Sequence, residues 1–277
     1  MNLQPPIKPH TPITLIKPDA QVTLINVILE NTWTANNEAD DIIDYCINHD
    51  IQYKIMTPES LFDMDHAQFF NSIYFCDTAI VQYHLRETNC SYLIPDTYES
   101  VYNEFYSRKI EQIRWGDVNI SILTNPIFIK PIGNSKSFDG TIITTESDNY
   151  SLQLVSNKSP NTIIYKSDVV NFICEYRLLI GNGKLYGYGF IRGRRMESFT
   201  EELNITKIIE LTGENFRCID IGFVMKPLFK WIIIEVNPAF SLDDYDIPIQ
   251  IYLDFCIDSC KWINSYVNKT NNIKIEK

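Results

Sequence analysis

The last third of the chain places one acidic residue in an apolar segment and an acid–amide pair in the next. Asp220 lies in Cys-Ile-Asp-Ile-Gly-Phe-Val, and Glu235 and Asn237 lie in Trp-Ile-Ile-Ile-Glu-Val-Asn. Residues two apart on a β-strand share a face, so Glu235 and Asn237 project together. Ile234 and Val236 are then expected to point into the core. A hairpin would bring Asp220 alongside, giving hard oxygen ligands that suit Mg²⁺, unless this is only the solvated face of a sheet.

A second pair of charged residues lies two apart in another apolar segment. Glu175 and Arg177 share one face of a strand predicted for residues 172–180. A guanidinium binds phosphate or carboxylate oxygens through two parallel hydrogen bonds, so Arg177 suits a transferring group. The alternative is an ion pair between the two residues, which contributes little at a surface.

Arg192, Arg194 and Arg195 form a dense basic cluster in an otherwise acidic protein. Such a cluster indicates a site for a triphosphate or a substrate carboxylate, and we favour this function for Arg192. The roles of Arg194 and Arg195 stay open, since arginines in a loop also serve solubility.

A lysine ends the apolar run Ile-Phe-Ile-Lys-Pro and precedes a polar loop bounded by glycines. This residue is Lys130, and the loop covers residues 133–140. A lysine in this place is either a surface residue whose stem covers apolar neighbours or a charge placed for an anion.

Taken together, these segments resemble the ATP-grasp superfamily, and within it the R-two-K clade. The signatures of that clade correspond here to Glu175-Tyr-Arg177, Asp220-Ile-Gly222 and Glu235-Val-Asn237. The resemblance covers roughly residues 95–267 and implies an ATP-grasp fold over residues 96–277, whose two α+β lobes clamp a nucleotide. With a small N-terminal α/β domain over residues 1–95, which matches the family only in general character, the fold class is α/β.

The resemblance also implies a role for each site residue. Lys130 would bind the nucleotide phosphates with the loop that follows, where Lys136 adds charge. A further phosphate-binding lysine would be Lys109, with Arg108 as its competitor, unless both are solvated helix charges. The segment that contains Tyr165 and Ser167 would bind adenine, and Glu175 would bind the ribose or orient a lysine. Arg177 and Arg192 would contact the transferred phosphoryl group. Mg²⁺ would be bound by Asp220, Glu235 and Asn237.

The implied activity is that of an ATP- and Mg²⁺-dependent ligase that joins a carboxylate to an amine through an acyl-phosphate. Its partners would be small-molecule or peptide carboxylates and amines. Asp243 or Asp244 would attract a cationic amine, unless they belong to a surface loop. The alternatives are a nucleotide-binding assembly factor or chaperone of the same fold, and an ATP-grasp kinase.

The first part of the chain shows the alternation of an α/β unit. Strands are predicted for residues 13–16, 52–56 and 78–83, and a helix for residues 39–47.

The second part is richer in strands joined by short turns. Strands are predicted for residues 161–165, 171–180, 184–191, 218–224 and 230–236, and the Asn-Gly turn after residue 181 indicates a hairpin. Ser198 and Glu201 have the spacing of a capping box, which predicts a helix through Leu211. A closing helix is expected from about residue 248 to about residue 267.

Composition limits the classes of partner. The 277 residues carry a formal net charge of −11, which argues against a general nucleic-acid or anionic-membrane binder. No apolar run approaches the roughly 20 residues that span a bilayer. The seven cysteines show no paired metal spacing, so they are expected to be reduced core thiols. These features predict a cytoplasmic protein, in the cytoplasm of a host cell if it is viral.

Overall fold

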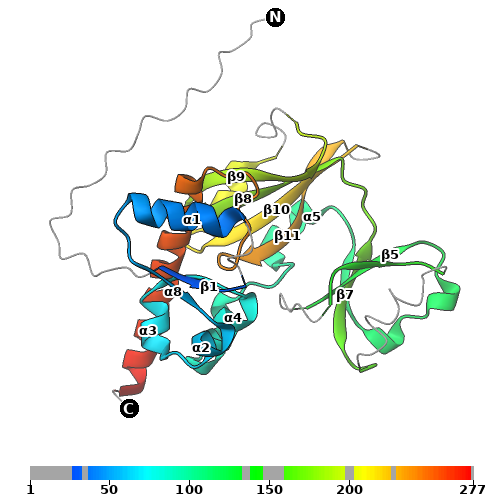
Figure 1. Cartoon of the computed structure of the whole chain (residues 1–277). Coiled ribbons are helices and arrows are strands. Elements are labelled where there is room, and N and C mark those ends of the chain that lie inside the picture. The colour runs from blue at the N-terminus through cyan, green and yellow to red at the C-terminus, as the bar shows by residue number, and fades with distance from the viewer. Residues whose placement is uncertain are drawn as a thin grey trace, which may run out of the picture.

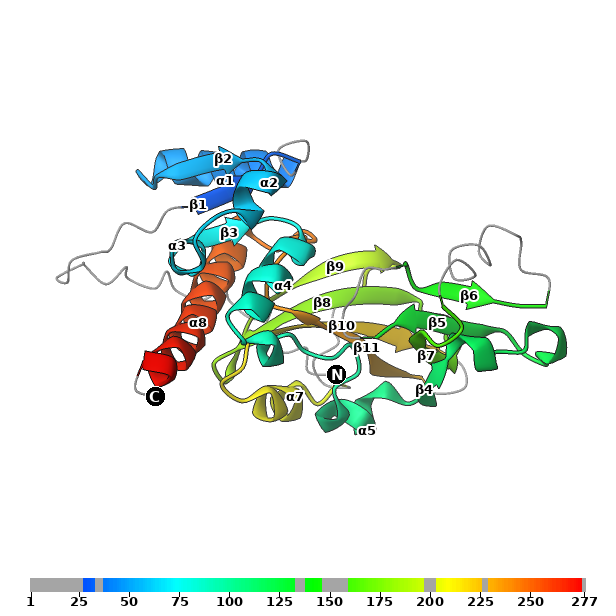
Figure 2. The ribbon, with the colours of Figure 1, turned by 90° about the horizontal axis from the view of Figure 1, so that it is seen from below.

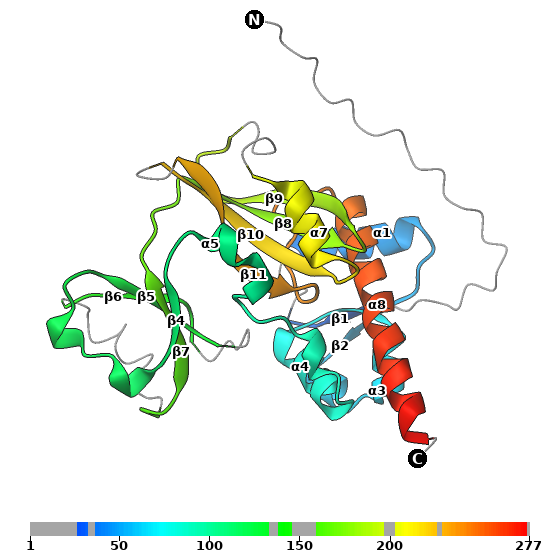
Figure 3. The ribbon, with the colours of Figure 1, turned by 180° about the vertical axis from the view of Figure 1, so that it is seen from behind.

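The computed structural model describes residues 27–32, 37–132, 138–145, 159–196, 203–225 and 229–275, and these form three sheets with helices around them (Figure 1). The sheet of the C-terminal part, β8–β11 (residues 174–238), lies between the sheet of the middle part, β4–β7 (residues 110–168), on one side and helix α8 (Ile249–Ile275) on the other (Figure 3). All seven cysteines are buried, as the sequence predicted.

The N-terminal unit contains a parallel sheet in the order β2-β1-β3. The predicted helix and strand at residues 39–47 and 52–56 are confirmed as α1 and β2, whereas the strand predicted for residues 13–16 lies outside the described residues. The central strand β1 was not predicted. The elements of the unit are β1 (Val27–Glu30), α1 (Asn37–Asn48), β2 (Tyr53–Met56), α2 (Pro58–Phe62), α3 (His66–Phe70), β3 (Ile73–Phe75), α4 (Thr78–Glu87) and η2 (Ser91–Leu93).

The strand predicted for residues 78–83 is wrong, because this segment is helix α4. Asp77 caps the helix by accepting a hydrogen bond from the Ala79 backbone N–H at 2.7 Å. The buried residues Ile80, Val81 and Leu85 follow helical spacing. The β-branched side chains suggested a strand, but packing of one helical face against the core decides the conformation.

The sheet formed by the middle of the chain, called the central sheet below, is antiparallel in the order β4-β7-β5-β6. One face packs a small core that includes Ile129 and Ile164, and the other face carries Lys130 beside Tyr165. Its elements are β4 (Ile110–Arg114), η4 (Trp115–Asp117), η5 (Ile120–Ile122), β5 (Ile127–Pro131), β6 (Thr141–Ile143) and β7 (Ile163–Asp168). The preceding elements η3 (Ser100–Tyr102) and α5 (Asn103–Tyr106) pack against the C-terminal sheet instead.

The C-terminal sheet is also antiparallel, in the order β11-β10-β8-β9. The predicted hairpin is confirmed, and its turn residues Asn182 and Gly183 have φ angles of 49° and 68°. The elements are β8 (Cys174–Gly181), β9 (Lys184–Gly193), α7 (Ile205–Thr212), β10 (Arg217–Val224) and β11 (Lys230–Pro238).

Two helices complete this lobe. Helix α7 is capped by Asn204, whose side chain accepts from the Lys207 N–H at 3.0 Å. The predicted capping box at Ser198 and Glu201 lies outside the described residues. The closing helix is α8 (Ile249–Ile275).

Helix α8, near the C-terminus, packs in one core with the N-terminal unit. Tyr252 lies near Phe75 of β3, with ring centroids 6.1 Å apart, and the buried cluster around them includes residues from both sides of position 95. Figure 2 shows α8 beside the N-terminal sheet. The domain division at residue 95 stays a prediction. None of the helices in the described part of the chain has the length and apolar character needed to cross a membrane.

Candidate functional site

The strand register brings the predicted metal ligands together. Asp220 of β10 lies opposite Glu235 of β11 and opposite Arg177 of β8. The register then shifts, because Ile221 pairs with Ile233, so Ile234 is an extra residue in β11. The expectation that Ile234 points into the core is therefore wrong, since this β-bulge leaves it only partly buried.

A continuous hydrogen-bond network joins these side chains. Arg177 donates to both oxygens of Asp220, from Nε to Oδ1 at 2.8 Å and from Nη2 to Oδ2 at 2.9 Å. The Asn237 amide donates to Asp220 at 3.0 Å and to Glu235 at 3.1 Å. Lys130, which reaches across from the central sheet, donates to Glu235. The two lobes are thus linked by an ion pair at the centre of the site.

Burial and neighbouring charges together shift the pKa values of this network. Burial raises the pKa of Asp220, and the nearby Glu235 adds to this rise although Arg177 opposes it. Burial alone would also raise the pKa of Glu235, but the Lys130 ammonium outweighs it and holds that pKa below its usual value. The pKa of Arg177 is raised because Asp220 outweighs the effect of burial. Two interacting carboxylates with opposite shifts are typical of functional sites.

The network opens into a cavity of about 310 Å³ between the lobes. Lys130, Arg177 and Glu235 lie along this cavity, and the segment after β11 adds Tyr245 and Asp243. The Arg177 guanidinium lies 4.6 Å from the centroid of the Tyr245 ring, a cation–π contact. The cavity is therefore lined by two cations and predicted metal ligands together with an acidic and an aromatic side chain.

Glu175 and Arg192 form a separate pair beside this network. Arg192 Nη2 lies 2.7 Å from Glu175 Oε1, and the two residues are opposite each other on β9 and β8. The ion pair between Glu175 and Arg177 that we considered does not form, because each residue has its partner on another strand. The Arg192 side chain is mostly exposed.

The structure does not bring the other predicted nucleotide-binding residues into this cavity. Lys109 is exposed and pairs with Glu111 at 2.6 Å, and the two side chains share the face of β4 opposite to that of Lys130. Ser167 is buried next to Phe128 in the register. Lys136 lies outside the described residues. These assignments stay predictions.

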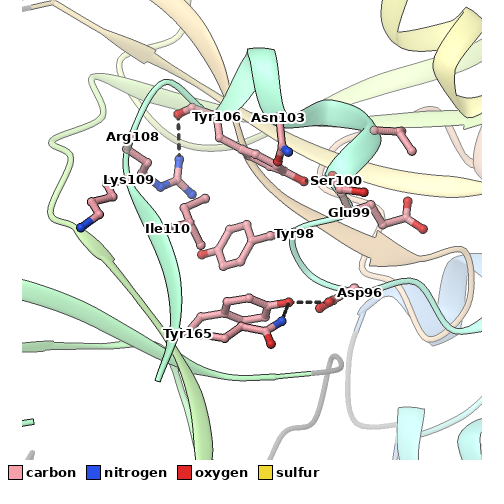
Figure 4. A pocket seen from close by; sticks show the side chains of 12 residues that line it. Asp96, Tyr98, Glu99, Ser100, Asn103, Tyr106, Arg108, Lys109, Ile110 and Tyr165 are labelled. Atoms are coloured by element: carbon pink, nitrogen blue, oxygen red, sulfur yellow. Dashed lines mark hydrogen bonds between the residues drawn. The ribbon is translucent and has the colours of Figure 1, made fainter. Parts of the chain in front are cut away.

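Tyr165 lines a second cavity of about 780 Å³ (Figure 4). This cavity lies beside residues 94–109, which lead from η2 to β4 and are called the linker below. The Tyr165 hydroxyl donates to Asp96 and accepts from the Gln112 amide at 3.0 Å. Tyr98 packs edge-on against it, with ring centroids 4.7 Å apart. Tyr165 is also the register partner of Lys130, and its predicted role as an adenine wall stays a prediction.

Several residues of the site had no signal in the sequence. Thr78, at the N-terminus of α4, and Ser241, in the segment after β11, also line the cavity of about 310 Å³ that Lys130 borders. The aromatic, acidic character of residues 240–246 was noticeable, but nothing in it indicated that Tyr245 would cover Arg177. Thr78 was hidden because its segment was taken for a strand.

The donor set fits a small, hard cation. Among the described residues, no group of three or more His, Cys, Asp or Glu side chains is placed to hold a metal ion. The site instead offers two carboxylates and one amide, with the positive charges of Lys130 and Arg177 beside them. Mg²⁺ commonly binds one or two carboxylates and takes its remaining ligands from water and nucleotide phosphates, so this small set is sufficient.

The fold and this site define an ATP-grasp protein. The family model of the ATP-grasp domain from the R-two-K clade, family 2, matches residues 105–255, so the chain belongs to this family. The predicted family and the α/β ATP-grasp fold are thereby confirmed.

Two solved structures share the fold. A D-cycloserine synthetase, DcsG, aligns over 86% of this chain and 99% of its own, with 10% identity and a TM-score of 0.54. A D-alanine–D-alanine ligase from Bacillus anthracis aligns over 87% of this chain and 98% of its own, with 15% identity and a TM-score of 0.50. At such identities the similarity extends to the fold alone. No curated protein matches the sequence significantly.

Proposed function

We propose that this protein is an ATP- and Mg²⁺-dependent ligase that joins a carboxylate to an amine. The observation that carries the proposal is the largely buried network of Arg177 and Asp220 with the partly buried Lys130, Glu235 and Asn237, which spans both lobes and borders one cavity. Membership of the ATP-grasp family supports ATP as the nucleotide. The names of the two similar structures, a synthetase and a ligase, agree with the reaction class.

Asp220, Glu235 and Asn237 would hold the metal, and Lys130 and Arg177 would bind the nucleotide phosphates. When bound, Mg²⁺ neutralises phosphate charge and polarises the phosphoryl oxygens. In this structure Lys130 and Arg177 pair with the carboxylates, which keeps the buried charges balanced. When a nucleotide and its metal bind, the carboxylates would face the metal cation and the two cations would face the phosphates. Each charge would therefore again have a partner of opposite sign.

The reaction would proceed in two displacements. A carboxylate oxygen of the first substrate attacks the γ-phosphorus of ATP, and the bond to the bridging oxygen breaks, giving an acyl-phosphate and ADP. The amine, which binds as an ammonium, first loses one proton to free its lone pair and then attacks the acyl carbon. Inorganic phosphate leaves, and the nitrogen loses a second proton to give the amide. Arg177 would contact the transferred phosphoryl group, and exclusion of water from the closed site would limit hydrolysis of the intermediate.

Asp243 would bind the amine in its cationic form. It lines the cavity, whereas its neighbour Asp244 does not. This position favours Asp243 over Asp244, which the sequence left as equals. Amino acids, polyamines and peptide N-termini all present such an ammonium group.

Calorimetry of ATP binding with Mg²⁺ tests the nucleotide site. The wild type is compared with Lys130→Ala, with the double variant Glu235→Gln/Asn237→Ala, and with the exposed control Arg114→Ala. We expect metal-dependent binding in the wild type and the control and its loss in the other two. A wild type that binds no nucleotide would contradict the proposal.

Turnover assays separate the reaction classes. A ligase releases ADP and phosphate only when both a carboxylate and an amine are present, so a panel of amino acids and peptides is added in pairs. A stable phosphorylated product without free phosphate would identify a kinase. Tight binding without turnover across the panel would favour an assembly factor or chaperone.

A further inference from the structure

The outer edge of β11, which has no neighbouring strand in the described part of the chain, is covered by the linker that leads into the central sheet. β11 is an outer strand of its sheet, so the backbone groups on its outer side need partners from elsewhere. The Val236 N–H donates to the Thr97 carbonyl at 2.9 Å. Arg108 donates from Nη1 to the Ile233 carbonyl at 3.0 Å and from Nη2 to the Ile234 carbonyl. One linker thus binds three successive parts of the strand.

The β-bulge explains how a single guanidinium reaches two consecutive carbonyls. In a regular strand, successive carbonyls point to opposite edges, so one side chain on one edge reaches only every second carbonyl. The extra residue Ile234 breaks this alternation. The planar guanidinium presents several N–H groups in a fixed fork, which suits two neighbouring acceptors.

Arg108 also lies at the junction of the two lobes. It lies just before β4, which belongs to the sheet that carries Lys130. Its guanidinium lies 5.5 Å from the centroid of the Tyr98 ring and bonds the Tyr106 carbonyl at 3.5 Å (Figure 4). The side chain therefore contacts the linker and β11 from the first residues of the central lobe.

We propose that Arg108 is a positioning residue that holds the β-bulge of β11, so that Glu235 and Asn237 face Asp220 and Lys130. It acts through the backbone and does not bind the nucleotide phosphates. The importance of this role for nucleotide binding rests on the proposed function, but the backbone clamp itself does not.

Replacement of Arg108 by lysine separates positioning from phosphate binding. A lysine keeps the charge that a phosphate contact needs, yet its ammonium lacks the fork that spans two carbonyls. We expect Arg108→Lys and Arg108→Ala to raise the Kd for ATP with Mg²⁺ by a similar factor, about tenfold, which corresponds to about 1.4 kcal/mol. Arg114→Ala, which removes an exposed arginine from the adjoining strand β4, serves as the matched control and should leave the Kd unchanged.

A double-mutant cycle tests the link to Glu235. If Arg108 acts by orienting this carboxylate, Arg108→Lys has little further effect on the Kd in a Glu235→Gln background. Additive effects would overturn the proposal, and so would an Arg108→Lys variant that binds the nucleotide like the wild type.

Hydrogen exchange measured without nucleotide tests the clamp independently of the proposed function. We expect the amide of Val236 to exchange faster in Arg108→Lys, while amides of β8 and β9 keep their wild-type rates, which also shows that the fold is intact. Unchanged exchange at Val236 would overturn the positioning role even if nucleotide binding is lost. A wild type that binds no nucleotide, together with faster exchange at Val236, would remove the proposed function and leave the clamp.

Discussion

Both antiparallel sheets carry ion pairs between charged side chains, but the pairs differ in their exposure to solvent. In the C-terminal sheet, the side chains of Arg177 and Asp220 are 9% and 8% exposed. In the central sheet, those of Lys109 and Glu111 are 72% and 36% exposed. A surface pair is screened by water, whereas a buried charge must keep a partner because desolvation is costly. This difference in desolvation is the reason why the proposed nucleotide site is assigned to the buried pair beside the cavity and not to the exposed pair.

Breaking the buried pair from one side should have the largest effect. Asp220→Ala leaves the Arg177 guanidinium buried without its partner, and we expect the free energy of unfolding to fall by about 3–5 kcal/mol. Urea unfolding measures this change. The matched control is the double variant Arg177→Met/Asp220→Leu, which removes both charges and should be clearly more stable than Asp220→Ala. Equal stability of the two variants would show that desolvation does not govern the pair.

Removing Lys130, the cation that links the lobes, should mainly weaken nucleotide binding. Lys130→Ala leaves Glu235 without its ammonium partner, so the pKa of this carboxyl should rise from its lowered value. We expect the Kd for ATP with Mg²⁺ to rise at least about tenfold, given that a charge-assisted contact contributes about 1.5–3 kcal/mol. Calorimetry measures the Kd. Lys130→Arg is the control that keeps the charge, and it should lose less affinity than Lys130→Ala.

The proposed amine-binding role of Asp243 can be tested by neutralising one carboxylate at a time. We expect Asp243→Asn to raise the KM for the amine about tenfold with little change in the KM for ATP, because an exposed cavity carboxylate contributes about 1 kcal/mol or somewhat more to binding a cation. Asp244→Asn is the matched control and should leave both values unchanged. A larger effect at Asp244 would reverse the assignment. Initial rates of ADP release measure these parameters.

A buried histidine in the N-terminal unit should make stability depend on pH. His84 bonds the Leu61 carbonyl at 2.8 Å and the His66 ring at 2.7 Å, and burial lowers its pKa below 6.5. The unfolded state therefore binds more protons below pH 6.5, so stability is full above this pH and falls as the pH drops toward the folded pKa. Urea unfolding between about pH 7 and about pH 5 should show this loss.

His84→Gln removes the titrating group and keeps a side-chain amide that can donate to the Leu61 carbonyl. We expect its stability to fall less steeply with pH than that of the wild type, whatever its stability at neutral pH. An equally steep slope would assign the pH dependence to groups other than His84.

The smallest effect is expected at the exposed pair of the central sheet. Lys109→Ala should leave the unfolding midpoint unchanged, because its ammonium is largely solvated. Its position on the sheet face opposite to that of Lys130 also predicts an unchanged Kd for ATP. A tenfold loss of affinity would instead support the phosphate-binding role that the family resemblance implies for this residue.

The sequence by itself determined the elements whose local pattern is strong. The Asn-Gly turn fixed the β8–β9 hairpin, because both turn residues take positive φ angles. The alternation in β10 and β11 placed Glu235 and Asn237 on one face with Asp220 opposite, and the family followed from these motifs.

Only the tertiary structure decided the rest. Helix α4 was mistaken for a strand because a short run of β-branched residues carries the same apolar pattern as a buried strand, and packing selects between them. The partners of Arg177, Glu175 and Arg108 depend on strand register and on the bulge at Ile234. These contacts join residues far apart in the chain, so no local pattern in the sequence encodes them.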